Sequence, residues 1–316
     1  MKLIENCKIV YPFFKDVRIN IDAVSQCIDS LQEQEIPLPT WKDEFCYHGD
    51  AERTMDWIFL FNAINFCYWN TPSWHTTIKG IEWGKDDEAF GVMATIANAL
   101  HNGIPLQDYN YLLSLDKSDI SAMFAGSLKA GPLPMLEERL QGWIELGMAF
   151  QRFGNAVGMI RMAEQSAPKL AAFLVSSCPS WSDIQVYRDV KLPFHKRAWL
   201  CTAMLYERFI DDYDRRLLDW EHIPVFADYR LPQALRSLGI LEYSPKLAQI
   251  VDQKKTLPEN SVQEIEIRAC TVLAAQMIHA ELAHLTPLHI DAYLWTYAVQ
   301  KDNDIAPHHR TRTTKY

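Results

Sequence analysis

Apolar residues recur with helical spacing along much of the chain. From Pro134 onward, large apolar side chains follow one another at steps of three and four, at Leu136, Leu140, Trp143, Ile144 and Met148. Positions three or four residues apart share one face of an α-helix. The pattern therefore predicts a helix that ends near Phe153 and Gly154.

Capping signals predict further helices. Ser261 followed by Glu264 is a capping-box pattern, which predicts a long helix that runs to about His284. Ser244 and Pro245 predict another helix start, and Gly239 predicts the end of the helix before it. Short strands are predicted near Cys7 to Tyr11 and around Ile81 to Trp83. The expected fold class is mainly α, with a few short strands.

The composition fits a large folded unit. The chain has 316 residues, and 48% of them are hydrophobic, which is enough for a sizeable core. It has only 12 glycines and no low-complexity tract, so no flexible linker is indicated. We expect residues 1–316 to form one compact domain, or two closely packed helical lobes within it.

Net charge and cysteine usage limit the classes of partner that the protein is expected to bind. No stretch is apolar for long enough to cross a bilayer, and the start of the chain lacks the apolar core of a secretory signal. The seven scattered cysteines form no CxxC pair, which suits reduced core thiols in the cytoplasm. A net charge of −9 disfavours duplex DNA or intact tRNA as a partner. We therefore expect a small-molecule substrate and no membrane partner, and the sequence indicates no particular oligomeric state.

Familiar cofactor and nucleophile motifs are missing from the sequence. It contains no glycine-rich phosphate loop, no serine nucleophile elbow and no His/Cys spacing typical of a metal site. The adjacent His308 and His309 are expected to be solvated residues near the end of the chain. Neither a metal nor another cofactor is expected.

One short segment concentrates functional side chains. Asp228, Tyr229 and Arg230 are consecutive, and Pro232 follows them. Because proline fixes its own φ and restricts the preceding residue, we expect these three residues in a rigid extended or turn stretch just ahead of a short helix. Such groups are costly to bury unless they bind something, so the segment is a candidate catalytic site. The alternative is a helix cap with a surface ion pair.

A second candidate segment combines amides with aromatic rings. Ile58, Asn62, Asn65 and Trp69 follow at steps of four, three and four, which would place them on one face of a helix that Thr54 caps. Buried amides need partners, and a heterocyclic base offers both donors and acceptors. Asn65 would then bind the base, with Phe66, Tyr68 and Trp69 as stacking surface. The alternative is an ordinary core in which both amides bond the backbone.

Positive charge is expected at the start of another helix. Lys196 and Arg197 precede the apolar stretch from Ala198 to Cys201, and cations beside a helix N-terminus can hold a phosphate. The alternative is a pair of surface charges.

Two blocks near the C-terminal end carry further polar residues. Glu266 and Arg268 are expected to form a structural ion pair. Asp291 and Trp295 belong to a run of polar and aromatic residues spaced by two, which would align on a strand or spread around a helix.

Several blocks together resemble one known family. They are Phe226 to Leu247, Asn62 to Trp69, Pro193 to Ala198, Glu264 to Cys270, Ile290 to Ala298 and His308 to Thr313. In their order they resemble the queuosine salvage proteins, which are queuosine 5'-phosphate N-glycosylases. The stretches from about Lys79 to Leu115 and from Asp211 to Glu221 match nothing specific.

This resemblance implies a helical fold similar to that of DNA glycosylases and the release of queuine from queuosine 5'-phosphate. The reaction passes through an oxocarbenium-like sugar, so it needs a carboxylate near the anomeric carbon, and we assign that role to Asp228. Asp291 becomes a candidate for binding the secondary amine of queuine, with Tyr229, Arg230 and Trp295 as further substrate-binding candidates. A DNA-repair-type glycosylase, a non-catalytic queuine-binding protein and a helical scaffold are the alternative functions.

Overall fold

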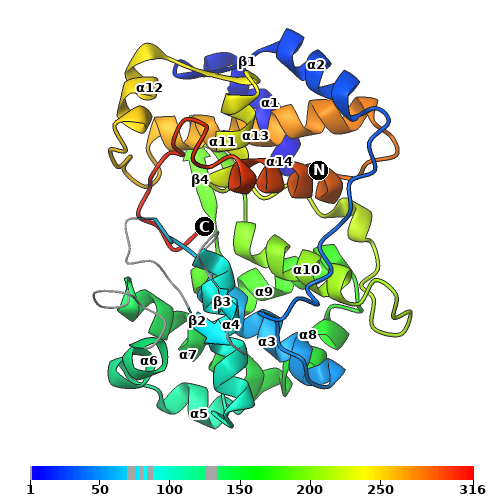
Figure 1. Ribbon diagram of the computed structural model, residues 1–316, viewed down its shortest axis with the longest axis vertical. Coiled ribbons are helices and arrows are strands. Elements are labelled where there is room, and N and C mark those ends of the chain that lie inside the picture. Colours follow the sequence, from blue (N-terminus) through cyan, green and yellow to red (C-terminus); the bar gives the residue numbers. More distant parts are fainter. Residues whose placement is uncertain (1, 70–75, 79–80, 84–87, 126–133) are drawn as a thin grey trace.

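Helices make up most of the protein. The structure is a computed structural model that describes residues 2–69, 76–78, 81–83, 88–125 and 134–316 (Figure 1). The strands of this part of the chain pair two by two, always antiparallel: β1 (Val17–Ile19) with β6 (Leu241–Tyr243), β2 (Thr76–Ile78) with β3 (Ile81–Trp83), and β4 (Ile184–Tyr187) with β5 (Val190–Pro193). The expectation of a mainly α fold is confirmed.

The lower half of Figure 1 holds the middle of the chain. Its helices are α3 (Ala51–Ala63), α4 (Glu88–His101), α5 (Tyr109–Ser114), α6 (Lys117–Phe124), α7 (Leu136–Phe153), α8 (Ala156–Met162), α9 (Ala167–Ser177) and α10 (Lys196–Arg208). Short 3-10 helices cover Pro179–Trp181 and Trp220–His222. Helix α3 packs against α4, α7, α8 and α10, so it forms the centre of this half.

The upper half joins the two ends of the chain. It contains α1 (Lys2–Val10), the 3-10 helix Tyr11–Phe13, α2 (Ile21–Leu31), α11 (Arg230–Ser237), α12 (Pro245–Asp252), α13 (Val262–Glu281) and α14 (Pro287–Gln300). Helix α13 packs against α1, α2, α11, α14 and β1. Its residues from Glu264 to Ala275 are all buried, as expected of a helix that neighbours surround on every side.

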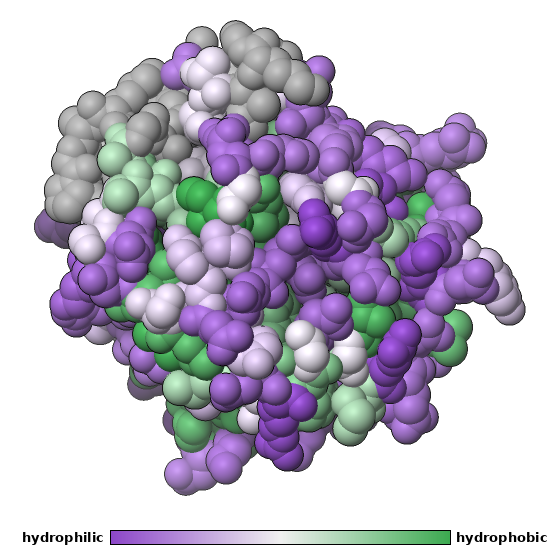
Figure 2. Space-filling model, turned by 90° about the horizontal axis from the view of Figure 1, so that it is seen from below, coloured by the Kyte–Doolittle hydropathy of each residue, from purple (hydrophilic) through white to green (hydrophobic). Residues whose placement is uncertain are grey.

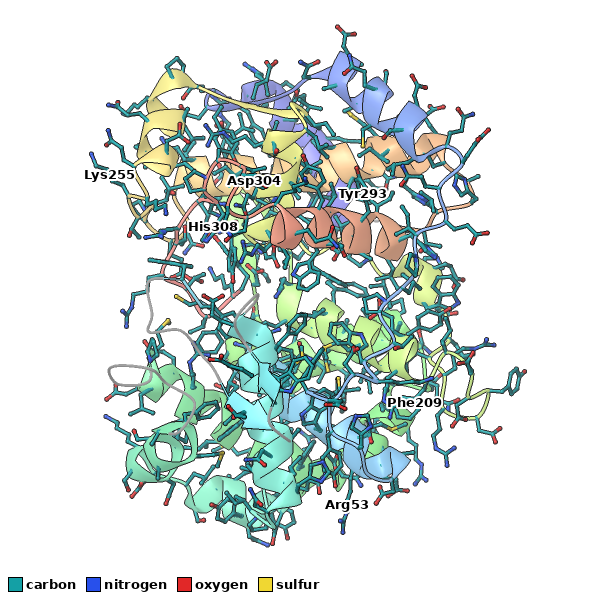
Figure 3. All side chains as sticks on the ribbon, in the orientation of Figure 1. Arg53, Phe209, Lys255, Tyr293, Asp304 and His308 are labelled. Carbon is teal, nitrogen blue, oxygen red and sulfur yellow. The ribbon has the colours of Figure 1, made fainter. Side chains whose placement is uncertain are left out.

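Each half has its own core. One large cluster of buried apolar side chains spans Phe45 to Phe226 and includes Leu288, while a second joins residues 3–31 to residues from Tyr187 onward. Side chains fill both halves, with Phe209 and Arg53 in the lower one and Tyr293 and His308 in the upper one (Figure 3).

A glycine sets where α3 meets α7. A Cβ atom at Gly142 of α7 would lie 2.3 Å from the carbonyl oxygen of Ala63, the last residue of α3. Nearby, the Trp143 indole donates to the Leu60 carbonyl at 2.9 Å. These contacts fix the end of α3 and therefore the course of the segment that follows it, which begins at Ile64.

The strongest sequence signals are confirmed. Helix α7 ends at Phe153 with Gly154 as its cap, and Ser261 caps α13 through the backbone N–H of Glu264. Ser244 caps α12 in the same way, and Ile81–Trp83 is a strand. All seven cysteines are buried and unpaired.

Three expectations about secondary structure and internal pairing are wrong. Cys7 to Tyr11 is helical, within α1 and the following 3-10 turn, because its apolar residues pack on α13. Helix α3 is capped by Asp50 and ends at Ala63, so Asn65 and Trp69 do not continue its face. Glu266 and Arg268 do not pair: Glu266 accepts backbone N–H groups of residues 15–17, and Arg268 binds Asp183.

Figure 2 shows the molecule from below the view of Figure 1. The surface on this side is largely hydrophilic, and its apolar residues lie in patches among polar ones. Within the described residues, no helix combines the length and the apolar character that a membrane span requires.

Candidate active site

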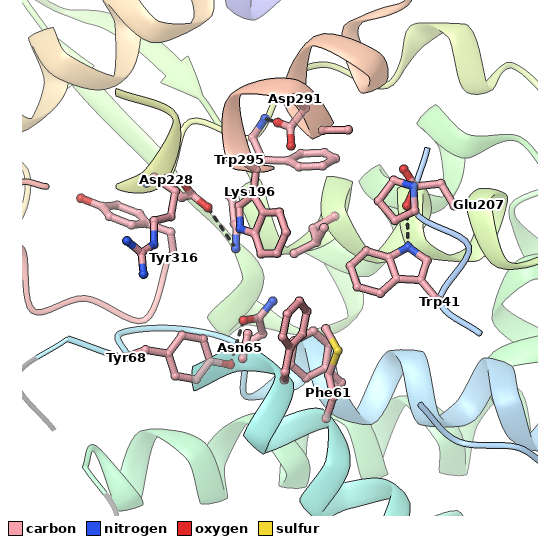
Figure 4. A pocket seen from close by; sticks show the side chains of 18 of the residues that line it. Trp41, Phe61, Asn65, Tyr68, Lys196, Glu207, Asp228, Asp291, Trp295 and Tyr316 are labelled. Carbon is pink, nitrogen blue, oxygen red and sulfur yellow. Dashed lines mark hydrogen bonds and ion pairs between the residues drawn. The ribbon is translucent and has the colours of Figure 1, made fainter. Parts of the chain in front are cut away.

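A cavity of about 250 Å³ lies between the two halves. Its walls come from stretches far apart in sequence: residues 39–45, 61–68, 89–93, 196–207, 226–230 and 288–295, together with Tyr316. Asp228, Lys196 and Tyr316 lie at one side of the cavity, and Trp41 and Glu207 lie at the other (Figure 4).

Asp228 occupies the turn immediately before α11, as its sequence predicts. Its Oδ1 accepts the backbone N–H of Arg230 at 2.8 Å and that of Leu231 at 3.4 Å. Amides at a helix start carry partial positive charge and stabilise an ionised carboxylate. Because Oδ1 is engaged with the backbone, Oδ2 is the oxygen that approaches Lys196.

Lys196 is the cation beside Asp228. It is the first residue of α10, and its Nζ lies 3.7 Å from Asp228 Oδ2 while both side chains are largely buried. His195, just before it, has a left-handed backbone with φ of 48°. The cavity thus contains a carboxylate and an ammonium group at close range, from two different helix N-termini.

A buried ion pair holds both of these groups in place. Arg268 of α13 binds Asp183 through two hydrogen bonds of 2.9 and 2.6 Å, and its Nε donates to the Ala227 carbonyl at 2.7 Å. Asp183 in turn accepts, through its carbonyl oxygen, the N–H groups of Phe194 and His195 at 2.9 and 3.2 Å. Burial lowers the pKa of Arg268, but the charge and the hydrogen bonds of Asp183 raise it by more. The pKa of Arg268 therefore stays above its usual value. One ion pair therefore fixes the residue before Asp228 and the residues before Lys196.

Three further acidic residues line the cavity, namely Asp43, Glu207 and Asp291. Asp291 of α14 accepts the Phe226 N–H at 2.7 Å, and Glu207 of α10 accepts the Trp41 indole N–H at 2.5 Å. Burial raises the pKa of Asp291 well above its usual range, and the neighbouring Asp228 and Glu207 act in the same direction. Burial also raises the pKa of Glu207 to about 8, although the Trp41 hydrogen bond opposes this shift. Near neutral pH, the environment of Glu207 therefore favours the protonated carboxyl, and burial shifts the balance for Asp291 in the same direction.

Aromatic rings line the space between these polar groups. They are Phe45, Phe61, Tyr68, Phe90 and Trp295, and the Phe90 and Trp295 rings meet edge to face with centroids 5.7 Å apart. The Tyr68 hydroxyl donates to Asn65 Oδ1 at 2.8 Å. Flat apolar walls with one oriented amide suit a heterocyclic base.

The structure brings most of the candidate residues together. The candidates that line the cavity are Asn65, Tyr68, Lys196, Asp228, Tyr229, Arg230, Asp291 and Trp295. Arg230 is also held by two residues outside the lining, because its Nη1 lies 2.5 Å from Asp302 Oδ1 and 3.2 Å from Gln233 Oε1.

Arg197 lies outside the cavity lining. Its guanidinium donates to the carbonyl oxygens of Asn62, Ala63 and Thr314 at 3.1, 3.0 and 2.8 Å, and the side chain is fully buried. A guanidinium bound in this way is not available to a phosphate. Arg197 instead joins the end of α3 to the C-terminal segment, which corrects the role expected from its position next to Lys196.

Phe66 and Trp69 also lie outside the lining. The guanidinium groups of Arg139 and Arg197 lie 4.5 and 5.0 Å from the centre of the Phe66 ring. The Trp69 indole donates to the Thr311 carbonyl at 3.2 Å. Since α3 ends at Ala63, Trp69 does not lie on the helical face on which the sequence places it.

The last residues of the chain are part of the site. The Tyr316 hydroxyl donates to Glu264 at 2.7 Å, and the backbone N–H of Cys67 donates to the Tyr316 carbonyl at 2.9 Å. His309 is buried, and the His308 ring lies 4.5 Å from that of Tyr229, so the expectation of solvated histidines is wrong. Burial lowers the pKa of His308 to about 4 and that of His309 to about 3.

Several lining residues were not singled out from the sequence. Trp41, Phe61, Phe90 and Tyr316 carry no recognisable motif. Glu207 does have a signal: it follows Lys196 and Leu200 at steps of four and seven, which places all three on one helical face. Among the described residues, no cluster of three or more His, Cys, Asp or Glu side chains is arranged to hold a metal.

Comparison with known proteins points to one family. The family described as queuosine salvage protein matches residues 45–316. A relative from Sphaerobacter thermophilus, named queuosine 5'-phosphate N-glycosylase/hydrolase, is 32% identical over 95% of this chain and 93% of its own length. Relatives with the same name from Bos taurus and Schizosaccharomyces pombe are 27% and 28% identical, over 99% and 87% of this chain and 98% and 83% of their own lengths.

Proposed function

Because the chain belongs to the queuosine salvage protein family, we propose that it hydrolyses the N-glycosidic bond of queuosine 5'-phosphate and releases queuine and ribose 5-phosphate. The observation that supports this most directly is the buried Asp228 carboxylate beside Lys196 in an aromatic cavity. The released queuine is then available for tRNA modification.

Asp228 acts on the sugar. As the bond between C1' and N9 breaks, its electron pair leaves with the base and positive charge develops on the ribose, which Asp228 Oδ2 stabilises. Water supplies a hydroxyl group to C1' and a proton to the departing base. Asp228 can assist as a general base that accepts a proton from the water. Alternatively, it can act as a nucleophile that first bonds to C1', and water then displaces it.

The walls recognise the base. A 7-deazaguanine lacks the ring nitrogen N7 that purine glycosylases protonate, so catalysis depends more on electrostatic stabilisation and on binding of the base. The aromatic rings stack on the base, and Asn65 bonds its edge. Asp291 binds the secondary amine, because a cationic group nearby favours the ionised carboxylate over the neutral form that burial prefers.

Cations near Asp228 bind the phosphate. Lys196 and Arg230 both line the cavity, and Arg230 is held in position by Asp302 and Gln233. A phosphate there would lie close to the sugar on which Asp228 acts.

A direct assay tests this function. Purified protein is incubated with queuosine 5'-phosphate, and free queuine and ribose 5-phosphate are quantified by mass spectrometry. We expect equal amounts of both products, released over many turnovers. Stoichiometric capture of the nucleotide without ribose 5-phosphate would identify a binding protein instead.

We propose further that the substrate is a free nucleotide and that the protein acts in the cytoplasm. The net charge of −9 provides little attraction for a polyanion, and the buried free thiols suit a reducing compartment. A gel-shift assay with damaged duplex DNA and with tRNA at moderate salt should show no complex. A specific shift with damaged duplex would favour a DNA-repair glycosylase.

A further inference from the structure

Glu207 is an acidic lining residue that lies across the cavity from Asp228. Figure 4 shows it with Trp41 on the side opposite Asp228 and Lys196. The Glu207 side chain is buried, at 4% exposure, and the Trp41 indole N–H donates to its Oε2 at 2.5 Å. Trp41 and Glu207 thus line one side of a cavity whose walls also include several aromatic rings.

The surroundings of Glu207 point to a ligand. In the part of the chain that the structure describes, Glu207 forms no salt bridge, and its side chain accepts one hydrogen bond, the one that Trp41 donates to Oε2. A buried carboxyl normally has its oxygens satisfied. Since Glu207 lines the cavity, Oε1 is placed to bind a polar group that enters there.

The proposed substrate has such a group at the matching end. If the ribose and phosphate lie at Asp228 and Lys196, the base extends through the aromatic middle. The substituent of queuine, a cyclopentene ring with two hydroxyl groups joined through an amine, then points away from the sugar. Its hydroxyl groups are the most distant polar atoms of the molecule.

Building on the function proposed above, we propose that Glu207, oriented by Trp41, binds the hydroxyl groups of the cyclopentene ring and so selects nucleotides that carry it. A neutral carboxyl group both donates and accepts hydrogen bonds, and a pair of neighbouring hydroxyl groups offers both partners. Asp291 remains the group for the amine, so the two acids read different parts of one substituent.

Two substrates distinguish binding of the cyclopentene hydroxyl groups by Glu207 from a merely structural role of this residue. Queuosine 5'-phosphate carries the ring, whereas the 5'-nucleotide of 7-aminomethyl-7-deazaguanine keeps the amine and lacks the ring. Glu207→Leu should lower kcat/KM for the first about tenfold or more, and leave that for the second nearly unchanged. Trp41→Phe, which keeps an aromatic ring, should give a smaller loss in the same direction.

Glu207→Gln is the matched control, because an amide also donates and accepts. It should retain most of the activity on queuosine 5'-phosphate. Thermal melting of each variant verifies folding, and if Glu207→Leu does not fold, the comparison rests on Trp41→Phe.

Three results would overturn the inference. They are equal losses on both nucleotides, no loss on either, and a Glu207→Gln variant as impaired as Glu207→Leu, since the last would indicate that the charge is needed. Failure of the proposed function is recognised separately, because the wild-type protein would then release no base from queuosine 5'-phosphate.

Discussion

Two neighbouring cations in the chain have different surroundings. Lys196 lines the cavity and lies 3.7 Å from Asp228, whereas Arg197 binds three backbone carbonyl groups away from it. Consecutive residues of a helix point about 100° apart, so a shared place in the sequence does not give a shared role.

Replacing each cation should therefore have a different effect. Lys196→Ala should reduce kcat/KM for queuosine 5'-phosphate by about ten- to a hundredfold, and reduce that for unphosphorylated queuosine much less, because a charged contact to the phosphate is lost. Arg197→Ala serves as the control: it should lower the melting temperature and impair both substrates alike. Equal losses on both substrates for Lys196→Ala would assign the phosphate to other residues.

Glu207 should make stability depend on pH. Burial raises the pKa of its carboxyl from 4.5 to about 8, so between these values the folded state keeps a proton that the unfolded state loses. The free energy of unfolding should therefore fall as the pH rises through this window, by up to several kcal/mol from this group. Urea unfolding of the wild type and Glu207→Gln near pH 5 and near pH 8 measures the effect. The variant should lose less stability, and parallel pH dependence of both proteins would contradict the assignment.

A functional residue is recognisable from the sequence when its neighbours in the chain form an unusual combination. Asp228 was recognisable because an acid, a phenol and a guanidinium precede Pro232. Glu207 was missed because a single acid in an apolar helix is conspicuous only once the helical face is known to border a cavity. His308 and His309 were placed in solvent because their burial depends on long-range packing that no local pattern encodes.

At the scale of elements, the site is built where helices begin. Helix α10 starts at Lys196 and α11 starts just after Asp228, and both starts are joined by the Arg268–Asp183 pair of α13 and the segment before β4. The helices were predictable because caps and apolar spacing are local. The strand expected at Cys7 to Tyr11 was not correct, since packing on α13 decides the conformation of that apolar run.

Variants of the buried Arg268–Asp183 pair should show that its effect on stability differs from its effect on activity. Asp183→Leu alone leaves the Arg268 charge buried and should destabilise the fold by about 3–5 kcal/mol. Asp183→Leu combined with Arg268→Met should recover much of the melting temperature without restoring kcat, because the Ala227 carbonyl still lacks its hydrogen bond. A double variant that is as active as the wild type would show that the pair does not position Asp228.

At the scale of the whole molecule, the cavity requires both halves. Phe61 and Glu207 come from one half, Asp228 and Asp291 from the other, and Tyr316 bonds to both through Cys67 and Glu264. We propose that the halves behave as two lobes of one domain. The sequence predicted a large helical unit, but which distant segments meet depends on tertiary packing, so most aromatic lining residues could not be assigned.

Catalysis by this site depends on Asp228, which we propose stabilises the developing positive charge on the ribose. Asp228→Asn is nearly the same size and can still accept the Arg230 N–H, so the fold and the binding of queuosine 5'-phosphate should be retained. Single-turnover release of queuine by this variant, with binding measured on the same protein, is the most direct test. We predict a rate at least about a hundredfold below that of the wild type with little change in affinity. Release at the wild-type rate would show that Asp228 does not stabilise this charge.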